Sequence, residues 1–340
     1  MKKQLTILIV AAMTAQLAAC GKSTEPVEST TTSRPTAEST HNEISSGIPD
    51  KTDLKETEIN IWTLNNEYYS NLSPEQSGDV LDDATFALNR SVEEKLNCKL
   101  NFIDNGTDAA DCNTEIQKLI LADDTAYDLF NATEWSAGKL ISQQIYLNIA
   151  DAPYLSLDEK WWDKDYMTAM SISDDTLYTL VGDCTLDRTR FLNCIYYNRT
   201  VYEKFYSDAD ETQENYISMV HQSARFMALP VNCTKIEAVC AVLEEMAFIG
   251  HHELLPVYYE TVLKDKYTRD SESARMLDLI RETVRADFGY IFANDFENIA
   301  YIPRSLVKND STAFASEYAR LESSAKEKSA ALYELFKKAD

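Results

Sequence analysis

The chain contains little glycine and little histidine, and both shortages narrow the chemistry that it can perform. Its 340 residues include 8 glycines and 4 histidines. The sequence holds no glycine-rich loop that could bind a phosphate and no Gly-x-Ser-x-Gly nucleophile turn. The adjacent His251 and His252 lack the spacing of a zinc-protease motif, and we interpret them as the polar start of a helix. The sequence therefore predicts no catalytic activity, no cofactor and no metal site.

Basic residues are also scarce. Lys and Arg number 32 against 56 Asp and Glu, which gives a formal net charge of −24. Without residues 1–19 the chain keeps 30 basic residues, and its charge becomes −26. An acidic exterior repels nucleic acid and anionic lipid headgroups, so we predict no nucleic-acid partner and interpret the charge as a source of solubility. Among so many carboxylates, neighbouring pairs do not indicate a glycoside hydrolase.

The apolar stretch at the N-terminus is too short to span a membrane. It runs from about Leu5 to Ala12, behind Lys2 and Lys3, whereas a spanning helix needs about 20 apolar residues. A charged start, a short apolar middle and an exit of small residues are typical of a secretory signal peptide. We predict this signal peptide over residues 1–19.

Residues 17–20, with the sequence LAAC, resemble the lipobox of bacterial lipoproteins, in which the chain is cut before a cysteine that then carries lipid. The resemblance implies that Cys20 bears a thioether-linked diacylglycerol, and two acyl chains hold a protein stably on a membrane. The alternative is an ordinary signal peptide followed by a chance cysteine. We expect a lipid-anchored protein that faces outward from the cell membrane.

Residues 20–56 are predicted to be a disordered tether that follows the lipidated cysteine. Ser, Thr, Glu and Pro dominate this segment, and large apolar residues are almost missing from it. Such a composition cannot bury enough surface to offset the entropy lost on ordering the backbone. We therefore expect the folded part to stand away from the membrane.

Six further cysteines lie in a compartment that permits disulfides: Cys98, Cys112, Cys184, Cys194, Cys233 and Cys240. Their spacings match no zinc pattern. Cys184 and Cys194 could close a hairpin, but buried free thiols explain the residues equally well, and we assign no disulfide.

The first part of the folded region alternates strands with helices. Runs of β-forming residues predict strands at 58–64, 98–103 and 127–132. Apolar residues at helical spacing predict helices from Val80 to Asn97, over 113–122 and over 137–143. This alternation is the signature of a parallel α/β layer. Trp62 falls inside the first strand and is more plausible as a core residue than as a ligand contact.

The remainder is predicted to be mainly helical with a few short strands. We expect strands at 177–181, 191–197, 216–221 and 226–231, with a turn at Gly182 and Asp183. Thr234 and Glu237 predict a capping box at the start of a helix. A second helix is marked by Leu277, Ile280 and Val284, and a long one covers 312–338.

Several segments, taken in order, resemble extracellular solute-binding lipoproteins of sugar-type ABC transporters, in the form common among Gram-positive bacteria. They are YDLFNATEW (127–135), KWWDKDYMTAMSI (160–172), LYTLVGD (177–183) and CIYYNRTVYEKF (194–205), followed by ETQENYISMVH (211–221), LKDKYTRDSESARMLDLI (263–280) and DFGYIF (287–292). The similarity extends over most of residues 58–295. It implies a type II periplasmic-binding-protein-like α/β fold, in which two lobes are joined by crossing strands and the ligand binds between them.

The resemblance implies a ligand site in the loops beyond the carboxyl ends of the parallel strands, where α/β folds usually bind ligands. The residues at these positions are Asn65 and Glu67 after the first strand, Glu134 and Trp135 after the third, and Asp183 and Tyr197 near the crossing to the other lobe. Aromatic rings stack on sugar faces, and carboxylates and amides bind hydroxyls. Plainer roles remain open, because Trp135 could pack on the surface and Asp183 could only form a turn. We interpret Trp161 and Trp162 mainly as packing residues.

The pattern of the family is interrupted after Phe205. The chain passes directly to a segment that resembles a much later part of these proteins, so much of the second lobe is expected to be missing. We predict an α/β N-lobe with crossover strands over 57–205, and a reduced second lobe with C-terminal helices over 206–340. Apolar surface that the missing sheet would cover could then be exposed and promote association.

The sequence thus predicts a monomeric, lipid-anchored extracytoplasmic protein that captures a solute, a carbohydrate, without catalysis. It would pass this solute to the permease subunits of an ABC importer. The alternative is a truncated homologue that cannot support transport and acts as a surface interaction module or a vestigial lipoprotein.

Overall fold

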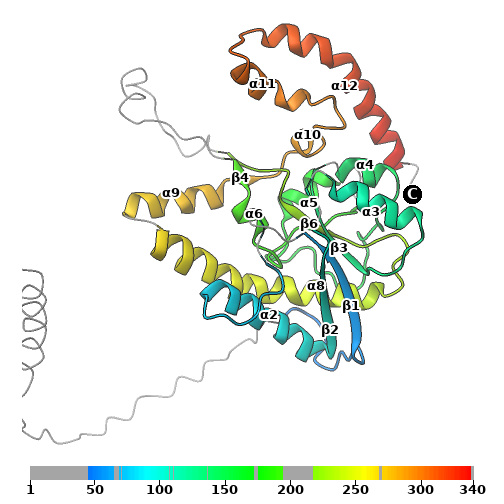
Figure 1. The fold of residues 1–340 in the computed structure, drawn as a ribbon, viewed down its shortest axis with the longest axis vertical. Helices are drawn as coiled ribbons and strands as arrows, with labels where there is room; N and C mark the ends of the chain where they lie inside the picture. Colours follow the sequence, from blue (N-terminus) through cyan, green and yellow to red (C-terminus); the bar gives the residue numbers. More distant parts are fainter. Residues whose placement is uncertain are drawn as a thin grey trace, which may run out of the picture. The chain divides into compact units, whose positions relative to one another are not determined.

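Figure 1 shows the computed structural model of the chain, which describes residues 45–64, 69, 71–106, 108–109, 111–135, 137–171, 175–193, 217–267 and 270–337. These residues belong to one compact unit, Ser45–Asp340. The predicted signal peptide, Cys20 and the tether up to residue 44 lie outside the described residues.

The main sheet has four strands in the order β2-β1-β3-β6. They are β1 (Thr57–Thr63), β2 (Cys98–Asp104), β3 (Leu129–Thr133) and β6 (Arg225–Ala228). Strand β1 runs parallel to both β2 and β3, whereas β6 is antiparallel to β3. Ile59, Ile61 and Phe130 are almost fully buried, as expected for strands covered on both faces. The predicted parallel α/β layer is confirmed.

Helices α2 (Val80–Leu96), α3 (Cys112–Leu121) and α4 (Ala137–Ser142) follow the first three strands. The Asp79 carboxylate accepts hydrogen bonds from backbone N–H groups of the first turn of α2, and the helix ends at Asn97 in the left-handed conformation. Leu88, Val92 and Leu96 recur every four residues and are all buried, because residues at this spacing share one helix face. The three predicted helices are therefore present with nearly the predicted bounds.

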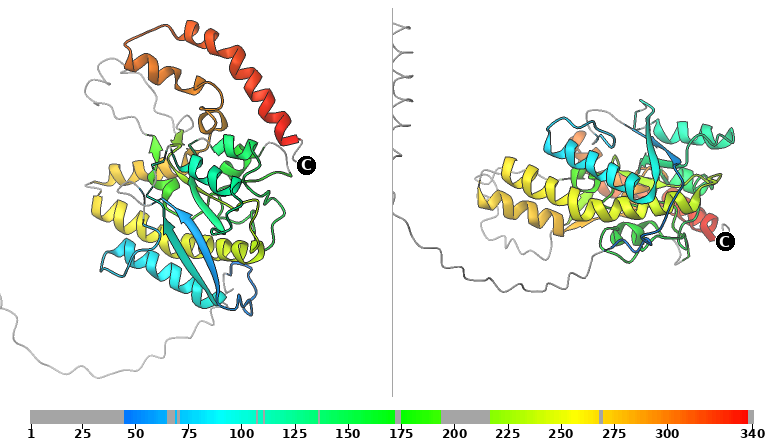
Figure 2. Two further views of the ribbon diagram at one scale, coloured as in Figure 1. Left: turned by 45° about the vertical axis from the view of Figure 1, so that its right-hand side comes forward. Right: turned by 90° about the horizontal axis from the view of Figure 1, so that it is seen from below.

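The rest of the described chain is mainly helical (Figure 2). Its helices are α5 (Lys164–Met170), α6 (Asp187–Arg190), α8 (Ile236–Ile249), the π-helical η3 (Gly250–Leu254) and η4 (Val257–Tyr267), α9 (Ser271–Glu282), α10 (Phe288–Ile291), the 3₁₀-helical η5 (Ile299–Tyr301), α11 (Ile302–Lys308) and α12 (Phe314–Lys337). A small sheet has the order β4-β5-β7, with β4 (Leu192–Asn193), β5 (Ser218–Val220) and β7 (Val284–Arg285). No helix of the described residues has the length and apolarity needed to cross a membrane.

The last part of the predicted tether packs against the domain. Ile48 is buried in the core. The Ser46 hydroxyl donates to Oε2 of Glu245 on α8 at 2.5 Å, and Nζ of Lys95 on α2 lies 2.7 Å from the same oxygen. We refer to Ser46, Lys95 and Glu245 as the tether clasp. Through it the chain is joined to α2 and α8 as soon as it enters the folded unit.

Two strand predictions need correction. Residues 177–181 form no strand; Leu180 makes one isolated antiparallel bridge to Met227, with reciprocal backbone hydrogen bonds of 2.8 Å. This segment meets β6 at a single residue, so its β-forming composition does not extend into a ladder. Within the predicted strand 191–197 the structure describes β4 only, at Leu192 and Asn193, and residues 194–197 lie outside the described residues.

Three helix signals were also misread. The capping box of Thr234 and Glu237 does not form: Lys235 is the N-cap of α8 and no side chain caps the helix, while Nζ of Lys235 is 2.9 Å from Asp128. Helix α9 ends at Glu282, and Val284 belongs to β7 because it pairs with β5. The histidine pair is not a helix start.

His251 and His252 lie instead inside a long helix, where α8 continues into the π-helical turn η3. A π-helical turn inserts one residue into the helix and is frequent at functional sites. His251, in this turn, lines the pocket described below.

Strand β6 belongs to the predicted second lobe by its position in the sequence, yet it pairs with β3 of the first. One hydrophobic core also runs from Ile48 to Leu332. The boundary at residues 205 and 206 falls outside the described residues and stays a prediction.

The described cysteines are free thiols. Cys98, Cys112, Cys184 and Cys240 are buried and Cys233 is partly buried, whereas Cys194 lies outside the described residues. Burial raises the pKa of the Cys184 thiol to about 12.

Candidate functional site

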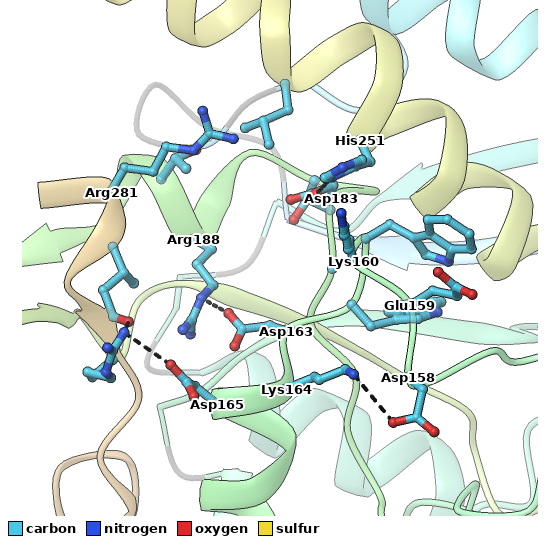
Figure 3. Close-up of a pocket in the computed structure, with 18 residues that line it drawn as sticks. Asp158, Glu159, Lys160, Asp163, Lys164, Asp165, Asp183, Arg188, His251 and Arg281 are labelled. Atoms are coloured by element: carbon cyan, nitrogen blue, oxygen red, sulfur yellow. Dashed lines mark hydrogen bonds and ion pairs between the residues drawn. The ribbon is translucent and has the colours of Figure 1, made fainter. Parts of the chain in front are cut away.

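A pocket of about 510 Å³ lies beside α5, α6 and the π-helical turn η3 (Figure 3). It is lined by Asp158, Glu159, Lys160, Trp161, Trp162, Asp163, Lys164, Asp165, Gly182, Asp183, Thr185, Arg188, Thr189, His251, Leu255, Arg281, Val284 and Arg285. We call this the charged pocket. Its lining comes from segments that are far apart in the sequence, including α9 and β7, so it exists only in the folded chain.

One side of the charged pocket is built from Asp183 and His251. Nδ1 of His251 donates a hydrogen bond to Oδ2 of Asp183 at 2.6 Å. Gly250 makes this contact possible, because a Cβ at that position would overlap the carbonyl oxygen of Asp183 and lie 2.6 Å from its carbonyl carbon. Burial raises the pKa of Asp183, and the hydrogen bond from His251 opposes that shift.

A second pair, Arg188 and Asp163, lines the pocket beside α6 and α5. The two side chains form an ion pair, and both are largely buried. Asp163 is also the N-cap of α5, where its carboxylate accepts a hydrogen bond from the backbone N–H of Tyr166 at 2.9 Å. Burial lowers the pKa of Arg188 to about 10, and the nearby Glu134 carboxyl opposes this shift. The guanidinium thus lies between the Asp163 carboxylate at the pocket and the Glu134 carboxyl group behind it.

Trp161 and Trp162 are fixed by a single carboxylate on α8. Their indole N–H groups donate to Oε1 and Oε2 of Glu244 at 3.0 and 2.9 Å, and the backbone N–H of Ser156 donates to Oε2 at 3.0 Å. Burial raises the pKa of Glu244, and these hydrogen bonds oppose the shift. Both tryptophans are 5% exposed or less, so they pack in the core, as predicted, and also line the pocket.

The rim of the pocket carries further ion pairs. Nζ of Lys164 is 3.4 Å from Oδ1 of Asp158, and Nη1 of Arg285 is 3.1 Å from Oδ2 of Asp165. These pairs are drawn as dashed lines in Figure 3. The pocket therefore presents many fixed donors and acceptors, while most of its charges are balanced locally.

Behind the pocket, a buried polar cluster occupies the carboxyl ends of β1 and β3. Arg225 of β6 forms a two-pronged ion pair with Asp187 of α6, and both side chains are fully buried. Nη1 of Arg225 also donates to the carbonyl oxygen of Leu64 at 2.8 Å, and its guanidinium lies 4.7 Å from the ring centroid of Tyr69. Because β2 and β3 lie on opposite sides of β1, this is the switch point at which open α/β sheets tend to bind ligands.

Glu134 follows β3 and belongs to the same region. Its side chain is 1% exposed, and Oε2 has no hydrogen-bond partner among the described residues. Burial raises its pKa from 4.5 to about 8, the positive charge of Arg188 opposes the shift, and the negative charge of Asp187 adds to it. At neutral pH the carboxyl group is therefore mostly protonated.

Glu134 should make the stability of the folded chain depend on pH. Between pH 4.5 and about 8 the folded state keeps a proton that the unfolded state loses, so the free energy of unfolding falls as pH rises. The slope from this single group is at most about 1.4 kcal/mol per pH unit. We expect Glu134→Gln to flatten the wild-type profile in urea unfolding between pH 5 and pH 8.

Glu327→Gln, at an exposed position of α12, is the matched control for this prediction, and its profile should follow that of the wild type. Parallel profiles for wild type and Glu134→Gln would contradict the assignment.

The structure brings some of the predicted ligand residues into this region. Asp183 lines the charged pocket, whereas Glu134 lies buried near Arg188 and does not line it. Trp135 is partly exposed, and its carbonyl oxygen accepts a hydrogen bond from Asn113. Asn65, Glu67 and Tyr197 lie outside the described residues. Contact of these six residues with a ligand remains a prediction.

No family model matches the chain, and no curated protein matches it with significance. Solved structures of binding proteins do match. The GacH receptor of Streptomyces glaucescens GLA.O, solved without ligand and in complex with acarbose and an acarbose homologue, is 9% identical. The match covers 83% of this chain and 98% of GacH, with a TM-score of 0.44.

Two more structures match over most of their length. The ABC substrate-binding protein Lmo0181 from Listeria monocytogenes, in complex with cycloalternan, is 11% identical; the match covers 82% of this chain and 99% of Lmo0181, with a TM-score of 0.41. The PBP AttC of Agrobacterium tumefaciens C58, in an open unliganded conformation, is 9% identical, with 71% and 96% covered and a TM-score of 0.39.

These solved structures include an ABC substrate-binding protein, which is the class of protein that the sequence resembles. Every TM-score is below 0.5, however, so these likenesses carry no conclusion about the ligand or mechanism of this chain. That question depends on its own residues.

Sequence reasoning missed most of the charged pocket. His251, Arg281 and Arg285 line it, yet no motif in the sequence around them marks them as pocket residues. Gly250 gave the one usable signal, since a glycine inside a helical stretch costs about 1 kcal/mol relative to alanine and usually has a packing reason.

Proposed function

We propose that this chain is a lipid-anchored extracytoplasmic solute-binding protein that captures a carbohydrate and delivers it to the permease of an ABC importer. The observation that supports this best is the charged pocket, which has paired donors and acceptors along its lining and two tryptophans in its wall. The lipobox at Cys20 and the ordered series of motifs from 127 to 292 agree with it.

A pocket of this kind suits a ligand rich in hydroxyl groups. Each sugar hydroxyl can donate one hydrogen bond and accept others. Carboxylates such as Asp183 and Asp163 accept, while Arg188 donates, so both capacities of a hydroxyl find a partner. The volume of about 510 Å³ falls within the range of about 300–1,000 Å³ common for small-molecule sites.

Capture in this pocket would be non-covalent. The side chains are already held by ion pairs and by Glu244, so they lose little conformational freedom when the ligand binds. Because the second lobe is proposed to be reduced, closure of two full lobes is not part of the mechanism. The ligand would instead be held by side chains of the pocket that are already in place before it binds.

Calorimetric titration of the full chain with oligosaccharides tests this proposal. A Cys20→Ser background keeps the protein free of lipid, and saturable binding is expected. Asp183→Asn should weaken binding by about tenfold, because it loses a charge-assisted hydrogen bond, whereas Asp310→Asn, an exposed turn residue outside the pocket, should not. Absence of binding across the panel would refute carbohydrate capture and favour a surface interaction module.

The lipid anchor has its own test. Wild-type protein expressed in a bacterial host with lipoprotein processing is expected in the membrane fraction and should incorporate labelled palmitate. Cys20→Ser should move the protein out of the membrane fraction, because no acyl chains remain attached. Cys233→Ser is the matched control and should stay with the membrane; if Cys20→Ser stays there too, Cys20 is not the anchor.

A further inference from the structure

Most charges of the charged pocket cancel in pairs. Asp163 pairs with Arg188, Asp165 with Arg285 and Asp158 with Lys164. Asp183 accepts the hydrogen bond of His251.

Three charged groups of the lining remain outside these pairs, namely Arg281, Lys160 and Glu159. For none of them does the structure give an ion pair within the described residues. With His251 neutral, the five acidic and five basic side chains of the lining balance, although the whole chain carries −24.

Arg281 is the best placed of these groups. It lies near the end of α9, and its guanidinium carbon is 4.6 Å from the ring centroid of the buried Tyr259, a distance typical of a cation–π contact. In Figure 3 the guanidinium points across the pocket toward the side that carries Asp183 and His251. The positive charge of Arg281 opposes the rise in the pKa of Asp183, in agreement with their placement on the same pocket.

A guanidinium that lies over an aromatic ring and lines a pocket can bind a planar carboxylate through two parallel hydrogen bonds. We propose that the solute is an acidic sugar, with its carboxylate on Arg281 and its hydroxyls on the paired side chains. The inference rests on the proposed function and names the class of sugar. One guanidinium without an ion pair among the described residues suits one carboxylate better than a doubly charged phosphate.

Titration calorimetry with paired ligands tests this inference. Each uronic-acid oligosaccharide is compared with its neutral counterpart of the same linkage, which differs only in the carboxylate. We expect the acidic member to bind at least about tenfold more tightly, because a charge-assisted contact to Arg281 is present only there. The difference should shrink at high salt, since the rim is exposed to screening ions.

Arg281→Gln should remove the preference for the acidic sugar, so that the acidic and the neutral member of each pair bind with equal affinity. Arg281→Lys keeps the charge but loses the fork, and should restore only part of the preference. Arg275→Gln is the matched control. Arg275 also belongs to α9, but it is exposed, pairs with Glu272 at 2.7 Å and does not line the pocket.

Each other outcome is decisive. Tighter binding of the neutral sugars, or of sulfated or phosphorylated sugars, overturns the carboxylate inference and leaves carbohydrate capture standing. An acidic preference that survives Arg281→Gln overturns the role of Arg281. Absence of binding by both members of every pair overturns the inference together with the proposed function.

Discussion

Replacing Arg225 by methionine is expected to lower the free energy of unfolding by about 3–5 kcal/mol. Arg225 and Asp187 are both fully buried, and they form a two-pronged ion pair with each other. Methionine fills much of the same space, but it leaves the Asp187 carboxylate buried without its counter-charge and the carbonyl oxygen of Leu64 without a donor. Urea unfolding of the full chain measures the effect.

Arg90→Met is the matched control for this prediction. Arg90 also pairs with a carboxylate, Glu93 at 2.9 Å, and also lies over an aromatic ring, that of Phe86, but its side chain is 56% exposed. A surface pair contributes about 1 kcal/mol or less, so the change should be small. Asp187→Leu combined with Arg225→Met should recover part of the loss, because it removes both charges. Equal effects of the Arg225 and Arg90 substitutions would mean that the pair is not buried.

Gly250→Ala is the second substitution with a large expected effect. In an unconstrained helix alanine stabilises by up to about 1 kcal/mol relative to glycine. Here the added Cβ would overlap the backbone of Asp183, which cannot move as a flexible side-chain tip can. We expect a loss of about 2–3 kcal/mol in urea unfolding, in line with overpacking elsewhere. Solute binding should weaken too, because the contact between His251 and Asp183 is broken.

Gly289→Ala provides the comparison for Gly250→Ala. Gly289 lies in α10, and an added Cβ would meet nothing closer than 3.4 Å, from the carboxylate of Asp287. This substitution should be neutral or slightly stabilising and should leave binding unchanged. If both alanine variants unfold alike, the close approach of α8 to Asp183 is wrong.

The sequence was a good guide to the elements whose residues repeat at regular spacing. Leu88, Val92 and Leu96 predicted α2 because its buried face recurs every four residues, and Ile59 and Ile61 predicted β1 because the strand is covered on both sides. These signals are local, so they survive without any knowledge of the partner element.

The charged pocket could not be predicted in the same way. Asp183 and His251 are 68 residues apart in sequence, and Arg281 comes from yet another helix. Asp183 and His251 meet where the π-helical turn η3 begins at Gly250. A π-helical turn shifts the register of a helix by one residue, and apart from Gly250 itself nothing in the sequence marks its position. Thr234 and Glu237 show the opposite case, where a correct local motif lost to the tertiary attraction between Lys235 and Asp128.

The tether clasp bears on how the protein takes mechanical load. A force applied to the chain at Ser45 would act on Ser46 first. The contacts of Ser46 and Lys95 with Glu245 would transmit it to helices α2 and α8. Glu244, the neighbour of Glu245 on α8, holds the tryptophan wall. Helix α8 would thus connect a force applied to the chain at Ser45 with the tryptophan wall of the charged pocket.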